Sequence, residues 1–464
     1  MLHYSIALII AGSLCLASPI SLTKRATASS GNFNVISIGV NGFPATFDPS
    51  GIPAINKTIN MMYIGTKISH GGYDIVNVQE VCKFSRRRLA DWIPTVLPYQ
   101  DFDYHATLYQ YDNHRFRTAT SGGVPVGSGL NTLSNYSWID FSRIDWYFCG
   151  GACVAKQGFT FMRMQIEEGV YIDMINLDTN TWTDPADQMA RRWNIEQVSD
   201  FINVNSVGNA VIVCGNTHLR YTSSRDNIRV LTAQNGLTDA WVQAIGGKAP
   251  AAGADPMICP EGVPLDINCE DEHNVLYRGS PFIDLTSLGF YYDTPIFLSQ
   301  EGSVLTSQNP IRVEFAWSFK SELRQSDLYG GAHGTWFNDL PLVPSAPKLA
   351  SIVLRGANRL DGFTLTLTSG RTFTHGGSGG TAYILDLASD EYIKTVKLCW
   401  NKHINGHTRI FYAKATTNKS KMIQVGQWSP HCATSVAPSG YGVVGTYGQD
   451  GQEIDQLGFI YAPQ

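Results

Sequence analysis

The sequence GVVGTYGQDGQEIDQLG, at residues 442–458, joins short apolar runs through closely spaced glycines. The same composition recurs through the last third of the chain, where alternating runs such as Phe363–Leu367 and Thr408–Ala413 stand between glycine-rich tracts. Alternation with a period of two residues between glycine turns is typical of antiparallel strands joined by hairpins. The pattern predicts that residues 328–462 form an all-β domain.

The residues before this domain follow a different pattern. The apolar runs Gly169–Leu177 and Ala210–Cys214 predict buried strands, whereas Asp187–Asn203 repeats its apolar side chains at nearly helical spacing. Strands that alternate with a helix predict an α/β domain. We assign residues 32–318 to that domain, with the boundary near residues 318–328.

Composition and the N-terminal residues limit the classes of function. A hydrophobic fraction of 43% in 464 residues suits two or three domains, and a formal net charge of −5 gives no basic field for nucleic acid. The apolar stretch Met1–Ala17 ends in small residues and predicts a signal peptide, with a possible pro-segment at residues 18–31. No later run approaches the ~20 apolar residues of a membrane span. We therefore expect a secreted, extracellular protein.

Secretion makes disulfide bonds the expected state of most cysteines. Those expected to pair are Cys149 with Cys153, Cys259 with Cys269, and the two left in the C-terminal domain, Cys399 and Cys432. Cys214 lies in a predicted buried strand and is expected to be a free thiol. Glycosylation sequons occur at Asn56, Asn135 and Asn418.

A series of short motifs runs through residues 328–462 in a specific order and spacing. They are Gly330-Gly331-x-x-Gly334, Phe337–Asp339, Ile352–Arg355, Arg359–Phe363, His375–Gly380, Asp390–Val396, Gly442–Gly445 and Gly451–Gly458. With these motifs the C-terminal domain resembles the jacalin-type (jacalin-related) lectins. The resemblance implies a β-prism I fold of three sheets that binds glycans or glycoconjugates.

The resemblance also implies a sugar site made by Gly331, Gly451, Gln452, Glu453 and Asp455. A sugar hydroxyl both donates and accepts, so the Asp455 carboxylate beside the main-chain amides of Gln452 and Glu453 suits it. Alternatively, Gly451 and Asp455 merely form the last hairpin. Many members of the family carry an aromatic residue in this loop, where Gln452 and Glu453 stand here. Mannose or glucose held by hydrogen bonds is therefore expected rather than stacked galactose.

A second series of motifs runs through residues 32–318. It consists of Gly72–Glu80, Ser121–Pro125, Asn131–Asn135, Lys156–Phe161, Val211–Gly215, Thr238–Trp241 and Asn309–Val313. With these motifs the domain resembles the endonuclease/exonuclease/phosphatase superfamily, which includes DNase I-like and sphingomyelinase-like proteins. The resemblance implies an α/β four-layer sandwich and metal-assisted hydrolysis of phosphodiesters.

The side chains that this chemistry requires are largely replaced. Glu80 matches the metal-binding carboxylate, but the early asparagine falls at Gly39 and the histidine expected after Leu177 is Asp178. The strand-end Gly-Asp-x-Asn reads Gly215-Asn216-Thr217-His218, and a late aspartate aligns near His273. The closing Ser-Asp-His reads Thr306-Ser307-Gln308, which removes the general base and the carboxylate that orients it.

Loss of a general base typically costs a factor of ~10² to 10⁴ in rate. The N-terminal domain is therefore predicted to be a pseudoenzyme that needs no cofactor. One alternative is a different metal site, made by Asp178, His218 and His273 with Glu80. Another is an active sphingomyelinase-like or nuclease-like enzyme that uses Mg²⁺ and is targeted to glycans by the lectin domain. A purely structural or toxin-like surface protein is the third.

Residues 81–100 interrupt the second resemblance directly after Glu80. They contain the basic run Cys82–Arg88, which is the densest in the chain and includes a cysteine without an obvious partner. One interpretation is a basic loop that contacts an acidic partner. The favoured hypothesis is a retained intron in the gene model.

Overall fold

The structure, a computed structural model, describes residues 28–42, 54–81, 83–84, 102–119, 128–150, 157–181 and 183–464. The predicted signal peptide, residues 18–27 of the possible pro-segment, Cys153 and most of residues 81–100 lie outside these ranges. Within the described ranges, no helix combines the length and apolar character required to cross a membrane.

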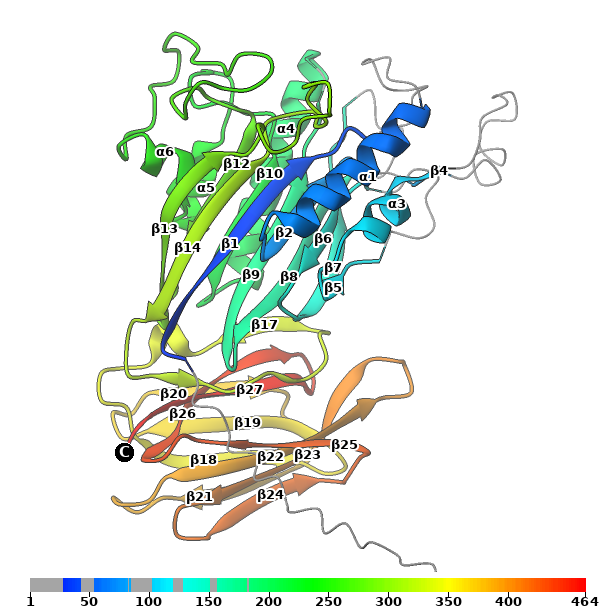
Figure 1. The fold of residues 1–464 in the computed structure, drawn as a ribbon. Coiled ribbons are helices and arrows are strands. Elements are labelled where there is room, and N and C mark those ends of the chain that lie inside the picture. Colours follow the sequence, from blue (N-terminus) through cyan, green and yellow to red (C-terminus); the bar gives the residue numbers. More distant parts are fainter. Residues whose placement is uncertain are drawn as a thin grey trace, which may run out of the picture.

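The N-terminal domain is built on two six-stranded sheets that face each other (Figure 1). The first sheet contains, in spatial order, β13 (Ile283–Tyr292), β14 (Ile311–Phe319), β1 (Ser30–Gly39), β2 (Ile75–Gln79), β6 (Asn131–Ser134) and β5 (Phe116–Arg117). The second contains β11 (Thr238–Asp239), β12 (His273–Arg278), β10 (Ala210–Asn216), β9 (Val170–Asp178), β8 (Gly158–Glu167) and β7 (Trp138–Asp145). The small ladder of β3 (Lys83–Phe84) and β4 (Phe102–Asp103) stands apart.

Helices pack on the sheets of this domain. They are α1 (Ala54–His70), α3 (Tyr104–Tyr111), α4 (Pro185–Asn205), α5 (Arg229–Asn235) and α6 (Ala240–Ala244). In β1, Val35 packs between the two sheets, whereas Ile36 and Ile38 pack with Met61 and Ile64 of α1. Successive residues of a strand point to opposite faces of the sheet. Because β1 carries apolar residues at both odd and even positions, the sheet is buried on both faces. The prediction of an α/β domain with a helix at α4 is confirmed.

The C-terminal domain consists of three antiparallel sheets. The first contains β15 (Arg324–Gln325), β27 (Ile454–Pro463), β26 (Tyr441–Asp450) and β17 (Thr335–Asn338), with β16 (Tyr329–Gly330) also paired to β27. The second contains β20 (Thr372–Gly376), β19 (Leu360–Leu367), β18 (Leu349–Gly356) and β21 (Thr381–Asp386). The third contains β24 (Met422–Gly426), β23 (Thr408–Thr417), β22 (Ile393–Lys402) and β25 (His431–Val436). Leu365, Val396 and Phe459, one from each sheet, share a buried apolar core, which confirms the all-β prediction.

The cysteines follow their predicted states where the structure describes them. Cys259 is bonded to Cys269, and Cys399 of β22 is bonded to Cys432 of β25. Cys149 is also in a disulfide, although its predicted partner lies outside the described residues. Cys214 is a buried free thiol, as its place in an apolar strand predicts.

A buried polar contact centred on Arg163 of β8 joins the two domains. Its Nη1 donates to both carboxylate oxygens of Asp173 at 2.7 and 2.8 Å, and its Nε donates to Asp140 at 3.1 Å. The guanidinium also lies 3.5 Å from the centroid of the Trp336 ring, which belongs to β17. Asp140 in turn accepts from Gln456 of β27 at 2.9 Å. One cation therefore pairs with carboxylates of one domain and an aromatic face of the other.

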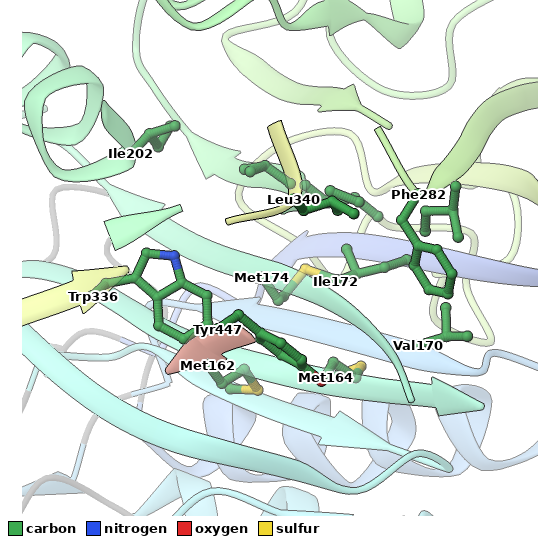
Figure 2. Packing of buried hydrophobic residues seen from close by; sticks show 14 of the residues in the cluster. Met162, Met164, Val170, Ile172, Met174, Ile202, Phe282, Trp336, Leu340 and Tyr447 are labelled. Carbon is green, nitrogen blue, oxygen red and sulfur yellow. The ribbon is translucent and has the colours of Figure 1, made fainter. Parts of the chain in front are cut away.

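Apolar packing surrounds this contact. Figure 2 shows Trp336 and Tyr447 of the C-terminal domain beside Met162 and Met164 of β8, and all four belong to one buried cluster. Trp336 Nε1 also donates to the carbonyl of Val207 at 3.1 Å. The apolar core is thus continuous from one domain into the other.

Arg163→Met should lower the free energy of unfolding by about 3–5 kcal/mol, because it leaves the buried carboxylates of Asp173 and Asp140 without their cation. Urea denaturation of the full chain would measure the change. Arg371→Met, at an exposed position of the C-terminal domain, is the matched control and should leave stability almost unchanged. A similar, small effect for both variants would contradict the role given to Arg163.

Candidate functional site

Three loops of the C-terminal domain meet around Asp455. They are Gly331–Gly334 after β16, residues 403–407 between β22 and β23, and Gly451–Glu453 between β26 and β27. The amide of Gly331 donates to the carbonyl oxygen of Asp455 at 3.2 Å. The fold therefore brings together the residues predicted to bind carbohydrate, namely Gly331, Gly451, Gln452, Glu453 and Asp455.

The carboxylate of Asp455 is paired inside the protein. Only 2% of the residue is exposed, and its Oδ1 lies 2.5 Å from Nη1 of Arg409. Burial raises the pKa of Asp455 to about 7, against the opposing effect of Arg409. An internal cation thus holds one carboxylate oxygen, and Oδ2 lies toward Gly334, where an added Cβ would approach it to 2.6 Å.

Glu453 is committed to arginine side chains. Arg359 donates to its two carboxylate oxygens at 2.8 and 2.6 Å, and Nε of Arg409 lies 3.3 Å from Oε2. The hydrogen bonds from Arg359 lower the pKa of Glu453. A sugar in this site would meet the main chain of Glu453 rather than a free carboxylate.

Gly334 and Gly451, which lie in two of these loops, differ in how closely the protein packs around them. Gly334 has a φ of +138°, and an added Cβ would lie 2.4 Å from the carbonyl oxygen of Asp450. Gly451 has no atom within 4 Å of such a Cβ, and the residue is exposed. Gly334 is therefore required by the protein's own packing, whereas Gly451 borders open space that a ligand can enter.

Sequence reasoning missed the cations and the aromatic rings of this site. Arg409 lies 46 positions before Asp455, and nothing in its local pattern marks it as the partner of that carboxylate. The rings of His333 and His407 stack with centroids 3.5 Å apart and nearly parallel planes. The stacked pair offers a flat face beside Gly331, although no aromatic residue stands in the loop Gly451–Glu453.

The residues compared with a phosphodiesterase centre lie at one edge of the two N-terminal sheets. Gly39 ends β1, Glu80 follows β2, Asp178 ends β9, Asn216 and His218 lie at the end of β10, His273 begins β12, and Ser307 and Gln308 precede β14. β1 is parallel to β2, and β9 is parallel to β10. The carboxyl ends of parallel strands meet at one edge of a sheet, which explains why these distant positions converge.

Hydrogen bonds fill the centre of this edge. Glu80 accepts the amide of Asn41 at 3.2 Å and a hydrogen bond from the Ser307 side chain. A Cβ placed on Gly39 would lie 2.5 Å from Ser307 Oγ and 3.7 Å from Cε1 of His273. The space that a longer side chain at position 39 would need is therefore already taken.

Burial has the largest effect on the pKa values of Glu80 and His273 at this edge. It raises the pKa of Glu80 to about 7, with Asp178 adding to the shift, and it lowers the pKa of His273 to about 4. Among the described residues, Nε2 of His273 and Oε1 of Gln308 have no hydrogen-bond partner. Gln308, at the position of the expected general base, cannot take a proton at neutral pH.

Magnesium prefers carboxylate oxygens and retained waters in octahedral geometry. Within the described ranges, no group of three or more His, Cys, Asp or Glu side chains is placed to hold a metal ion. Glu80 accepts from Asn41 and Ser307, while Asp178 pairs with His218 at 3.3 Å. Glu80 and Asp178 are therefore the carboxylates of this edge that could hold such an ion, and each already has partners inside the protein.

Comparison with known proteins bears on both domains. Residues 326–460 match the family model of the jacalin-like lectin domain. This part of the chain is a jacalin-like lectin domain.

The N-terminal region matches curated sphingomyelinases. Those of Mycobacterium bovis and Mycobacterium tuberculosis are 29% identical over 294 residues, which are 62% of this chain and 53% of the relative. The chain thus spans about half the length of these relatives. A secreted RxLR effector protein of Plasmopara viticola is 25% identical over 147 residues, covering 30% of this chain and 81% of that protein.

Solved structures of jacalin-related lectins align with the C-terminal third of the chain. A mannose-binding jacalin-related lectin from Ananas comosus has 22% identity and a TM-score of 0.28, covering 31% of this chain and 100% of that one. Malaysian banana lectin has 22% identity and a TM-score of 0.27, covering 30% of this chain and 98% of that one.

Alanine substitutions should show that the packing of the protein requires a glycine at Gly334 and does not require one at Gly451. Gly334→Ala should lower the free energy of unfolding by about 1–3 kcal/mol, because of its left-handed backbone and the clash with Asp450. Gly451→Ala should change it by no more than about 0.5 kcal/mol. Urea denaturation of the full chain measures both, and equal losses would contradict the open space assigned to Gly451.

Proposed function

We propose that this protein is a secreted carbohydrate-binding protein whose N-terminal domain is an inactive, DNase I-like four-layer α/β sandwich. The observation that carries the proposal is the meeting of the glycine-rich first loop, the last hairpin and the Asp455 carboxylate within a jacalin-like lectin domain. A sugar hydroxyl both donates and accepts hydrogen bonds. It therefore needs a fixed acceptor beside main-chain amides that can donate to it.

The ligand class proposed is a mannose-type or glucose-type sugar. Arg409 holds Oδ1 of Asp455 and thereby fixes the carboxylate, so one oxygen remains to accept from a hydroxyl. The amides of Gln452 and Glu453 would donate to the same sugar across the open space at Gly451. The face of the His333–His407 pair would contact the edge of the ring.

Location outside the cell is supported by the disulfides. Cys259–Cys269 and Cys399–Cys432 are bonds that persist in oxidising compartments and are rare in reducing ones. The apolar stretch at residues 1–17 is consistent with export.

Asp455→Asn should weaken glycan binding by about tenfold or more, because it removes a charged acceptor of sugar hydroxyls. A glycan array and titration calorimetry with the full chain measure the effect. The full chain is needed because an isolated C-terminal domain would expose Trp336 and Tyr447.

Asp386→Asn, at an exposed carboxylate away from the loops, is the matched control and should bind as the parent does. Gly451→Leu places a side chain in the open space and should also abolish binding without unfolding the protein. The proposal fails if the parent binds no glycan, or if Asp455→Asn and Gly451→Leu both bind like the parent.

The similarity to sphingomyelinases favours a second candidate function, a divalent-metal-dependent phosphodiesterase targeted by the lectin domain. We expect no hydrolysis of sphingomyelin or of a phosphodiester reporter above the blank at about 10 mM Mg²⁺, because the base position holds Gln308. Phosphate-ester turnover followed over hours measures this. Hydrolysis that Glu80→Ala abolishes would establish the second function instead.

A further inference from the structure

The third sheet of the C-terminal domain lies in a strongly basic part of the chain. Residues 392–449 contain seven lysine or arginine residues and no aspartate or glutamate, although the whole chain has a formal net charge of −5. Arg409, Lys419 and Lys421 pair with carboxylates that lie outside this stretch. Within the described residues, no ion pair with a carboxylate is formed by the other four, namely Lys394, Lys397, Lys402 and Lys414. The sheet therefore carries uncompensated positive charge.

Two of these lysines stand side by side on the outer face of the sheet. Lys397 of β22 lies directly opposite Lys414 of β23 in the antiparallel register. The residues on either side of each lysine belong to the buried core, namely Val396, Leu398, Ala413 and Ala415. Because successive residues of a strand point to opposite faces, both lysines point outward. Like charges that face each other on neighbouring strands repel, so an anion that binds to both would relieve the repulsion.

An exposed tryptophan lies against this pair of lysines. Trp428 stands in the loop between β24 and β25, and 64% of the residue is exposed. Nζ of Lys397 lies 3.8 Å from the centroid of its ring, and the ring centroid of Tyr412 of β23 lies 5.3 Å away. Both contacts come from strands of the third sheet. The exposed part of the indole therefore faces solvent beside the lysines.

The loop that carries Trp428 is held in place at both ends. At its start, the amide of Gln427 donates to the carbonyl of Phe411 at 2.9 Å. At its end, Cys432 is bonded to Cys399 of β22. A ligand that contacts the indole therefore meets a side chain on a fixed turn, and little conformational entropy is lost on binding.

Polar side chains extend this row to both edges of the sheet. Thr434 of β25 lies opposite Lys397, Gln424 of β24 lies opposite Lys414, and both residues are exposed. Hydroxyl and amide groups donate and accept hydrogen bonds, as the hydroxyls of a polysaccharide do. The first sheet makes the contact with the N-terminal domain, and Figure 1 shows β22 to β25 farther from that domain.

We propose that the outer face of the third sheet, formed by Lys397, Lys414 and Trp428, binds an anionic polysaccharide. Each ammonium pairs with a sulfate or carboxylate group of the polymer, and the indole contacts the apolar C–H face of a sugar ring. This site is separate from the loops around Asp455, and it does not depend on the binding of a neutral sugar there.

The aromatic content of this face favours a polysaccharide over a nucleic acid. Proteins that bind single-stranded nucleic acid stack successive bases on several aromatic side chains. Within the described residues 393–436, Trp428 is the only exposed aromatic residue. One aromatic ring beside two ammonium groups suits one sugar ring flanked by acidic substituents.

Binding of the full chain to heparin and to polygalacturonate tests the proposal. Heparin carries sulfate and carboxylate groups and polygalacturonate carries carboxylates alone, so the two probes distinguish the anions. In about 150 mM NaCl, the double variant Lys397→Gln, Lys414→Gln should bind about tenfold or more weakly than the parent, because both ion pairs are lost. Trp428→Ala should bind about fivefold more weakly. Surface plasmon resonance on the immobilised polysaccharides measures these affinities.

Two control variants separate this site from other effects. Lys320→Gln, which removes an exposed lysine of the N-terminal domain, is matched in charge and should bind both polysaccharides as the parent does. Asp455→Asn should also keep the affinity for them while it loses that for mannose-type sugars, so failure of one site is distinguished from failure of the other. The Lys397, Lys414 and Trp428 variants should keep the Tm of the parent within about 2 °C, because these side chains lie outside the core.

The dependence on salt reports the ion pairs directly. The logarithm of the affinity for heparin should fall linearly with the logarithm of the NaCl concentration, and the slope should be smaller by about 1–2 in the double lysine variant. A DNA duplex of similar total charge should bind more weakly than heparin. The proposal is overturned if the parent binds neither polysaccharide, if the double lysine variant or Trp428→Ala binds as the parent does, or if DNA binds as tightly as heparin.

Discussion

The arrangement of the whole molecule depends on the pairing of Arg163 at the junction of the domains. Its guanidinium pairs with Asp173 and Asp140 of one domain and lies over the ring of Trp336 of the other, so its partners come from both domains. A buried arginine without these partners would be costly, and so would the carboxylates without the arginine. The C-terminal domain therefore packs directly on the N-terminal core through buried polar and apolar contacts.

Both candidate sites solve the problem of buried carboxylates in the same way. At the lectin loops Arg409 pairs with Asp455, and at the acidic edge of the N-terminal sheets, where Glu80 and Asp178 lie, His218 pairs with Asp178. In each case a basic side chain of the protein contacts the carboxylate. The consequences differ, because a sugar is recognised by acceptors that stay oriented, whereas metal chemistry needs carboxylates that remain available.

The sequence predicts those parts of the structure that depend on local pattern. The apolar run of β10, the helical spacing in α4 and the short Cys259–Cys269 loop are all encoded within a few neighbouring positions. The pairings that define the sites are not, because Arg409 and Asp455 meet only after β23 and β27 are placed. Likewise His218 lies 40 positions from Asp178 and 54 from Glu272, and each of these residue types alone is common at an exposed strand end.

The packing of the acidic edge opposes the side chains that the resemblance to phosphodiesterases leads one to expect there. The position of the early asparagine is held by Gly39, and any Cβ there would strike Ser307 Oγ at 2.5 Å. Ser307 in turn hydrogen-bonds Glu80, so moving it would leave a buried carboxylate with one donor fewer. A histidine returned at position 308 would lack the orienting carboxylate, because position 307 now serves Glu80. Gly39 and Ser307 thus both belong to the packing around Glu80, and a longer side chain at position 39 would displace Ser307 from that carboxylate.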